Sequence, residues 1–158
     1  MLQRRPTFTK PWSEAQGKTR TTFGGGSQFA ATIKADPLLR ELYAARGRRR
    51  QLNYRQMAIR DYFHAPSVDA LLTAGYTAPA GGELVVRASD DFEVVRVILA
   101  LHAADGNVVA EGDAILRDRF WHFTVPPSAG GNPPVNAAVT AFDRPGNSTT
   151  RQFPLSPN

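Results

Sequence analysis

The sequence predicts an α+β protein in which a basic helical N-terminal arm precedes an antiparallel β-sandwich. The hydrophobic period changes near Pro66 from helical spacing to strict alternation. The formal charge changes sign there as well: residues 1–66 hold 13 Lys and Arg against 4 Asp and Glu, or +9, whereas residues 67–158 hold 6 against 10, or −4. Beyond Pro66, turn-forming clusters recur about every 8–12 residues. We therefore divide the chain into an arm, residues 1–66, and a sandwich domain, residues 67–158.

The first part of the arm is predicted to be an extended basic tail followed by an interrupted helix. Pro6 and Pro11 favour an extended tail. Ser13 is a suitable N-cap for a helix that runs to Phe23. Three consecutive glycines, residues 24–26, come next, and we expect them to end the helix and form a hinge, because glycine loses the most backbone entropy in a helix.

The second part of the arm is predicted to be a helical hairpin with a basic turn. Asp36 followed by Pro37 is an N-cap followed by a favourable first helical residue, and the helix that begins there should end near Gly47. A further helix is expected over residues 52–63, which Pro66 terminates.

The sandwich domain is predicted from alternating apolar residues. The clearest segment is residues 92–103, where every second residue is apolar. The predicted strands, about seven in all, are residues 68–71, 83–89, 92–103, 108–116, 120–125, 135–141 and 148–155. The predicted core consists of Leu84, Val86, Val95, Val97, Leu99, Leu101, Trp121, Phe123, Val135, Val139 and Ala141. This number of strands, with turns at this spacing, predicts an immunoglobulin-like (Ig-like) β-sandwich.

Two stretches resemble bacterial Ig-like modules. Residues 85–97 (VVRASDDFEVVRV) are similar to a strand, a turn and the valine-rich strand that follows in such modules, and residues 139–147 (VTAFDRPGN) are similar to the turn between the last two strands. The whole chain resembles a group of uncharacterised bacterial proteins that join a helical N-terminal region to one C-terminal Ig-like domain. That resemblance is carried by Asp36-Pro37, Asp61-Tyr62-Phe63 and Ala65-Pro66-Ser67-Val68-Asp69. It implies architecture and no activity, because the sandwich hosts many unrelated functions.

The sequence shows no recognisable catalytic machinery. Cysteine is absent, and neither G-x-S-x-G nor H-E-x-x-H occurs. The three histidines, His64, His102 and His122, are far apart in the sequence. We therefore predict a protein that is not an enzyme and has no cofactor, no metal and no small-molecule substrate.

An acidic cluster leaves two interpretations open. Asp90, Asp91 and Glu93 lie in one predicted turn and Asp143 begins another, and these oxygens would suit calcium if the turns were neighbours. The alternative is that each aspartate binds the backbone of its own turn, which is the commoner role of Asp in such positions. We favour turn capping.

The sequence also constrains where the protein is made. The N-terminus has no apolar run of signal-peptide length, and the longest apolar run, residues 97–101, is too short to cross a membrane. We expect a soluble protein that is synthesised in the cytoplasm and has no membrane partner. Its final compartment is unknown, and non-classical export by a dedicated machine remains open.

The basic arm predicts an interaction. Arginine outnumbers lysine in it, which favours bidentate contacts with carboxylate or phosphate. Aromatic residues, which are enriched at interfaces, accompany these charges. The predicted contact set is Phe8, Trp12, Phe23, Phe29, Arg46, Arg48, Arg49, Arg50, Arg55 and Arg60.

Three uses of this set remain open. In the first, the chain is a structural protein whose arm docks on neighbouring copies, and such a contact between unlike surfaces propagates into a ring or filament. In the second, the arginines bind nucleic acid without reading its sequence. In the third, the arm folds back on its own sandwich and forms no oligomer. We predict the first, with nucleic-acid binding as the alternative.

Overall fold

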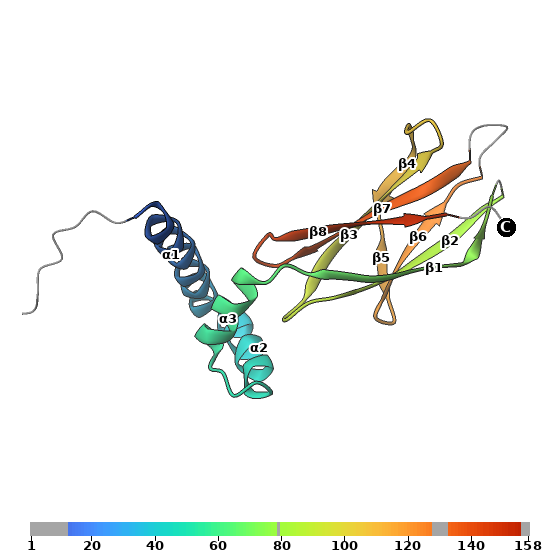
Figure 1. The fold of residues 1–158 in the computed structure, drawn as a ribbon. Helices are drawn as coiled ribbons and strands as arrows, with labels where there is room; N and C mark the ends of the chain where they lie inside the picture. The colour runs from blue at the N-terminus through green and yellow to red at the C-terminus, as the bar shows by residue number, and fades with distance from the viewer. Residues whose placement is uncertain (1–12, 79, 128–132, 156–158) are drawn as a thin grey trace, which may run out of the picture.

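The computed structural model describes residues 13–78, 80–127 and 133–155 of the chain. Over these residues the protein is α+β, with three N-terminal helices followed by two antiparallel four-stranded sheets (Figure 1). The helices are α1 (Glu14–Ala35), α2 (Pro37–Arg48) and α3 (Tyr54–Phe63). The strands are β1 (Ser67–Thr77), β2 (Gly81–Ser89), β3 (Val94–Ala103), β4 (Val108–Asp113), β5 (Ile115–Arg117), β6 (Phe120–Val125), β7 (Pro134–Asp143) and β8 (Ser148–Pro154).

The two sheets enclose one hydrophobic core. Their strand orders are β1-β2-β6-β5 and β4-β3-β7-β8, and every neighbouring pair is antiparallel. Nine of the eleven predicted core residues are buried, which confirms the alternation read from the sequence. These are Leu84, Val86, Val97, Leu99, Leu101, Trp121, Phe123, Val139 and Ala141.

Two predicted core residues lie outside the core because each occupies a β-bulge. Val95 is 42% exposed and Val135 is 38% exposed. Between β3 and β7, Val94 pairs with Asp143 and Arg96 pairs with Phe142, so Val95 is an extra residue without a partner. Val135 is the extra residue at the other end of the same pair of strands. A bulge shifts the alternation by one residue, which simple period counting does not detect.

The described residues form eight strands rather than about seven. The segment predicted as one strand over residues 108–116 is divided at Ala114, which is buried. Before Ala114 the chain pairs with β3 in one sheet, and after it the chain pairs with β6 in the other. The segment therefore crosses from one sheet to the other.

The first helix is continuous, and the predicted hinge at residues 24–26 is wrong. Gly25 and Gly26 face α3, where a Cβ on Gly25 would stand 2.3 Å from the Tyr62 hydroxyl and one on Gly26 would stand 3.2 Å from the Phe63 ring. Gly24 has no atom within 4 Å of that position. Two of the glycines thus allow close approach of two helices, and the contact outweighs their low helix propensity.

The predicted helical hairpin is completed by α1, so the helices form a small subdomain of three rather than two. Asp36 caps α2 by accepting hydrogen bonds from the amides of Leu38 and Leu39, as expected. Asn53 and Gln56 form a reciprocal capping box at the start of α3. The helices enclose their own core of Ala30, Ile33, Tyr43, Met57 and Ala58. We call residues 13–63 the helical subdomain.

Candidate interaction surfaces

The helical subdomain packs on the end of the sandwich that carries the β2–β3 and β7–β8 turns (Figure 1). Phe92, from the β2–β3 turn, stacks on Tyr43 of α2 with ring centroids 3.7 Å apart and planes 8° apart. The guanidinium of Arg144 lies 6.0 Å from the centre of the Phe92 ring. Asn147, in the β7–β8 turn, donates a hydrogen bond to the backbone carbonyl of Tyr62 in α3. We call this contact the junction.

Cations of the helical subdomain converge at the junction on the β2–β3 turn. Arg46 Nε donates to the carbonyl oxygen of Asp91 at 2.9 Å. The Asp91 carboxylate pairs with Arg50 and with Arg60, each at 2.9 Å, and His64 Nδ1 lies 3.5 Å from it. Three arginines of the predicted contact set are therefore bound to the protein's own sandwich.

Behind this ionic contact lies a buried acidic side chain. Asp61, in α3, has no exposed surface, and the Tyr43 hydroxyl donates a hydrogen bond of 2.6 Å to its Oδ2. Burial raises the pKa of Asp61, and the nearby carboxyl groups of Asp90 and Asp143 raise it further. The Tyr43 hydrogen bond opposes this rise in part, and the resulting pKa is about 8. Burial and the Asp61 contact also hold the pKa of Tyr43 far above its ordinary range, so the phenol stays a donor.

The aspartates of the two turns cap their own backbones, as predicted. Asp90 Oδ2 accepts hydrogen bonds from the amides of Phe92 and Glu93. Asp143 Oδ1 accepts from the amides of Gly146 and Asn147. Burial raises the pKa of Asp143, and the Asn147 and Gly146 hydrogen bonds partly oppose that rise. Over the residues that the structure describes, no three His, Asp or Glu side chains are grouped so that they could hold a metal ion.

The remaining members of the predicted contact set fall into three groups. Phe8 and Trp12 lie outside the described residues. Phe29 is half-buried among the helices, with its ring 6.2 Å from Tyr43 and 6.0 Å from Tyr62. The other members are exposed on the helical subdomain, and their arginines form no ion pair with another described residue: Phe23, Arg48, Arg49 and Arg55.

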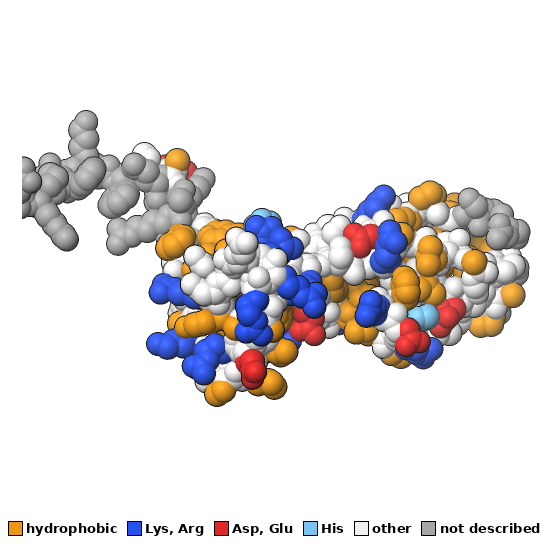
Figure 2. Space-filling view, turned by 90° about the horizontal axis from the view of Figure 1, so that it is seen from below, with side chains coloured by type: hydrophobic (Ala, Val, Ile, Leu, Met, Phe, Trp, Pro, Cys, Tyr) orange, Lys and Arg blue, Asp and Glu red, His pale blue; other side chains and the backbone are white. Residues whose placement is uncertain are grey.

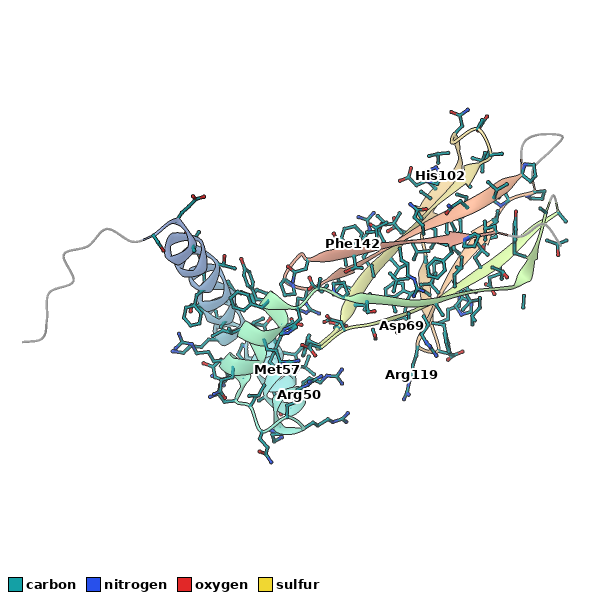
Figure 3. The ribbon with its side chains drawn as sticks, viewed as in Figure 1. Arg50, Met57, Asp69, His102, Arg119 and Phe142 are labelled. Atoms are coloured by element: carbon teal, nitrogen blue, oxygen red, sulfur yellow. The ribbon has the colours of Figure 1, made fainter. Side chains whose placement is uncertain are left out.

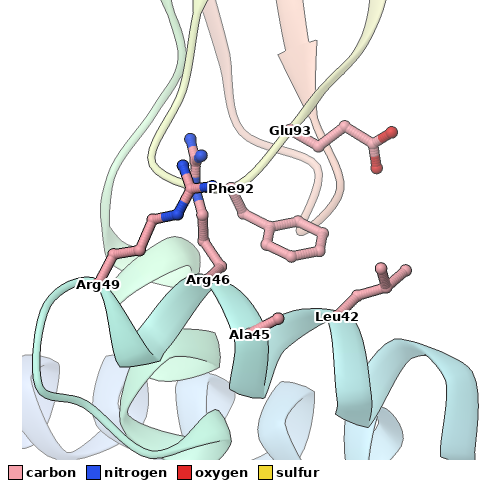
Figure 4. A pocket seen from close by; sticks show the side chains of 6 residues that line it. All are labelled: Leu42, Ala45, Arg46, Arg49, Phe92 and Glu93. Carbon is pink, nitrogen blue, oxygen red and sulfur yellow. The ribbon is translucent and has the colours of Figure 1, made fainter.

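The exposed arginines adjoin an apolar surface of α2. Leu38 is 67% exposed and Leu42 is 47% exposed. Leu42 borders a hollow of about 340 Å³ whose wall also includes Ala45, Arg49 and the Phe92 ring (Figure 4). Figure 2 shows Lys and Arg side chains spread over this face of the helical subdomain, with hydrophobic side chains between them. We call Leu38, Leu42, Arg48 and Arg49 the α2 surface.

Two pairs of exposed apolar side chains lie on edge strands of the sandwich, where sequence analysis named no site. Val108 and Val109 in β4 and Ile115 and Leu116 in β5 are exposed, and these strands form the outer edges of their sheets. We call these four residues the β4–β5 edge. Sequence analysis predicted residues 108–116 as one strand and said nothing of its burial, so the exposure of both ends was not foreseen.

The described histidines do not converge on one place. His64 lies at the junction, and His122 Nδ1 pairs with Glu83 at 3.1 Å on the sandwich. His102 lies toward the end of the sandwich away from the helices, while Arg50 and Met57 mark the helical subdomain (Figure 3). None of the described helices is long and apolar enough to cross a membrane. No protein-family model matches the chain, and no curated protein matches it.

Proposed function

We propose that this chain is a non-enzymatic structural protein that assembles with copies of itself, and that its sandwich is Ig-like. The orders β1-β2-β6-β5 and β4-β3-β7-β8 support the Ig-like assignment, because they correspond to the two sheets of that fold with one further strand beside the third. The fold alone does not give a function. The assembly proposal rests on the side chains that the fold leaves unpartnered.

One observation carries the proposal: the junction uses only part of the basic arm. Arg46, Arg50 and Arg60 are held by the β2–β3 turn, whereas Arg48 and Arg49 are exposed at the end of the helix whose Leu38 and Leu42 are exposed. A mixed apolar and arginine surface of this kind is typical of protein interfaces. The helical subdomain also contacts its own sandwich at the junction, so the α2 surface has a defined position relative to the sandwich.

We infer that the β4–β5 edge of a neighbouring copy is the acceptor. It offers exposed apolar side chains and the unpaired rows of two edge strands, together with Glu111 and Asp118, which are exposed and form no ion pair with another described residue. The α2 surface carries Arg48 and Arg49, whereas Glu111 and Asp118 accompany the β4–β5 edge, so these groups are complementary in charge. Because donor and acceptor surfaces differ, the contact is heterologous and propagates head to tail.

Light scattering coupled to size-exclusion chromatography tests this proposal. After nuclease treatment, wild-type protein should elute as oligomers whose mass increases with concentration, and Arg48→Glu/Arg49→Glu should elute as a monomer. Arg87→Glu/Arg151→Glu changes the net charge equally, but these residues lie on β2 and β8, outside both proposed surfaces, so this variant should leave assembly intact. A wild-type monomer at every concentration would refute self-assembly.

Mixing two defective variants distinguishes a heterologous contact from a symmetric one. Arg48→Glu/Arg49→Glu lacks a donor surface, and Ile115→Asp/Leu116→Asp lacks an acceptor surface. Each is expected to be monomeric alone, but the mixture should form a dimer and nothing larger, because each pair retains one intact contact. A mixture that stays monomeric would contradict the assigned pair of surfaces.

Nucleic-acid binding is the second candidate, and the exposed Arg48, Arg49 and Arg55 favour it. Three phosphate contacts would lower affinity about 40-fold between about 50 and 200 mM salt, compared with about 10³-fold for six contacts. Because the junction occupies three of the described arginines, we expect the affinity for nucleic acid to fall less steeply with salt than it would for six contacts. Nucleic acid that co-purifies with the protein and is released by about 500 mM salt would support this candidate.

A further inference from the structure

Two carboxyl groups from different parts of the fold meet at the junction with no proton donor between them. Asp61 comes from α3 and is fully buried, and Asp90 comes from the β2–β3 turn. Among the described residues, Oδ1 of Asp61 and Oδ1 of Asp90 are both buried and have no hydrogen-bond partner. Asp90 also lies close enough to Asp61 to be among the groups that raise the pKa of Asp61. Two facing acceptors without a donor are costly when buried.

The other oxygen of each group is already occupied. Asp61 Oδ2 accepts the hydrogen bond from Tyr43, and Asp90 Oδ2 accepts from the amides of Phe92 and Glu93. A single proton between the two Oδ1 atoms would therefore satisfy both groups.

We propose that the Asp61 carboxyl is protonated and donates a hydrogen bond to the Asp90 carboxylate. This hydrogen bond helps to hold the helical subdomain on the sandwich, so that the junction is a proton-binding site. When the proton leaves to water, two negative carboxylates face each other across the junction in a site that solvent does not reach. The contact between α3 and the β2–β3 turn is then weakened. This inference does not depend on the proposed self-assembly.

The charged groups around Asp61 are consistent with a retained proton. From α2 it faces the Tyr43 phenol, from the β2–β3 turn Asp90, and from the end of β7 Asp143. The nearest cations are engaged elsewhere: Arg46, Arg50 and Arg60 are bound to the turn at Asp91, and Arg144 pairs with Glu93. The side chains that α1 contributes to this core, Ala30 and Ile33, are apolar.

A proton fits the site better than a divalent cation does. The oxygens that are not engaged are one from Asp61 and one from Asp90, whereas calcium takes six to eight oxygen ligands. The described part of the chain holds no cluster of acidic or histidine side chains suited to a metal. Calcium is therefore an outcome that the test must exclude, not the proposed ligand.

The sign of the pH dependence follows from the direction of the shift. The pKa of Asp61 is about 8 in the folded protein against an ordinary value of 3.8, so the folded state holds a proton that the unfolded state lacks between these values. The stabilisation of the folded state by this proton is complete below pH 3.8 and is lost as the pH rises through about 8. Within this window the unfolding equilibrium constant should increase by up to tenfold for each pH unit from this one group.

Isosteric amide variants test the proposal. Asp61→Asn can donate its amide hydrogen to Asp90 and still accept from Tyr43, so it should reproduce the protonated state at every pH. Urea unfolding of wild-type protein at about pH 6 and pH 9 should show a large loss of stability at the higher pH, and Asp61→Asn should remove most of that loss. Asp118→Asn removes a charge from an exposed site and should leave the wild-type pH dependence unchanged.

If Asp61→Asn does not fold, titration of the carboxyl groups of the wild-type protein tests the proposal. Carbon-13 NMR of the wild-type aspartate carboxyls should show one group that titrates between about pH 7 and 9. If every aspartate titrates below about pH 5, the shared proton is refuted. Calcium is the last control: stabilisation of wild-type protein by added CaCl₂ that disappears in Asp61→Asn would overturn the proton in favour of a metal ion.

Discussion

The glycine run of α1 provides the sharpest test of how the helical subdomain is held together. Gly24→Ala and Gly25→Ala place the same methyl group on adjacent residues of one helix, but only Gly25 faces α3. In the exposed position the alanine should stabilise the helix by about 0.5–1 kcal/mol, because glycine loses more backbone entropy on folding. We expect Gly24→Ala to raise the free energy of unfolding by this amount.

The second variant should have the opposite effect. The new Cβ at Gly25 would stand 2.3 Å from the Tyr62 hydroxyl oxygen and 2.8 Å from the ring carbon that bears it. The ring is held by Phe29, at 6.0 Å, and Phe63, at 5.6 Å, so it cannot move without disturbing these contacts. Overpacking of this kind costs about 1–3 kcal/mol, and displacement of an aromatic pair costs about 0.5–1.5 kcal/mol more. After the gain of about 0.5–1 kcal/mol in helix propensity is subtracted, a net loss of about 0.5–4 kcal/mol remains.

Urea unfolding monitored by far-ultraviolet circular dichroism at the helical band measures both effects. Because both variants gain the same helix propensity, they should differ by the overpacking and aromatic costs, about 1.5–4.5 kcal/mol in the free energy of unfolding, with Gly24→Ala the more stable. Tyr62→Phe removes the closest atom, so Gly25→Ala should cost less in that background than in the wild type. Equal stabilisation by both alanines would refute the close contact and favour the hinge that the sequence predicts.

Three further predictions concern the junction and the bulges. Phe92→Ala removes the ring stacked on Tyr43 and should lower the free energy of unfolding by about 2–3 kcal/mol in urea, because Phe92 is only partly buried; a loss below about 0.5 kcal/mol would contradict the junction. Asp91→Ala should increase hydrogen exchange in α2 and α3 at low salt but hardly at high salt, because its ion pairs with arginines are partly exposed. Val95→Thr should change the free energy of unfolding little, whereas Val97→Thr, two residues away in the core, should lower it by about 1–3 kcal/mol. Similar losses for both variants would refute the bulge.

The elements that local chemistry determines could be predicted from the sequence. Asp36 followed by Pro37 specified the start of α2, and Asp90 and Asp143 specified two capped turns, because in each case a side chain binds the backbone a few residues away. Nine core positions followed from alternation alone. These features depend on neighbours in sequence, and so a sequence pattern can reveal them.

The features that were missed depend on partners distant in sequence. The glycines resemble a helix terminator until Tyr62, almost forty residues later, is known to pack on them. Val95 and Val135 fit the alternation but are displaced by bulges that only the pairing of β3 with β7 defines. Asp61 carries no sequence signal of burial, since its partner Tyr43 lies on another helix and the carboxyl groups that face it lie on the sandwich.

The junction also changes how the charge asymmetry of the chain should be interpreted. An arm of +9 beside a domain of −4 invites an intermolecular explanation, yet the fold spends Arg46, Arg50 and Arg60 on its own β2–β3 turn. The total charge is therefore not evidence for a partner, and only the arginines left exposed, such as Arg48 and Arg49, bear on that question. For the same reason, neutralising Asp91 frees two arginines and should strengthen any binding of polyanions while it weakens the junction. Such an opposite response of affinity and stability would separate internal charge pairing from external binding in one variant.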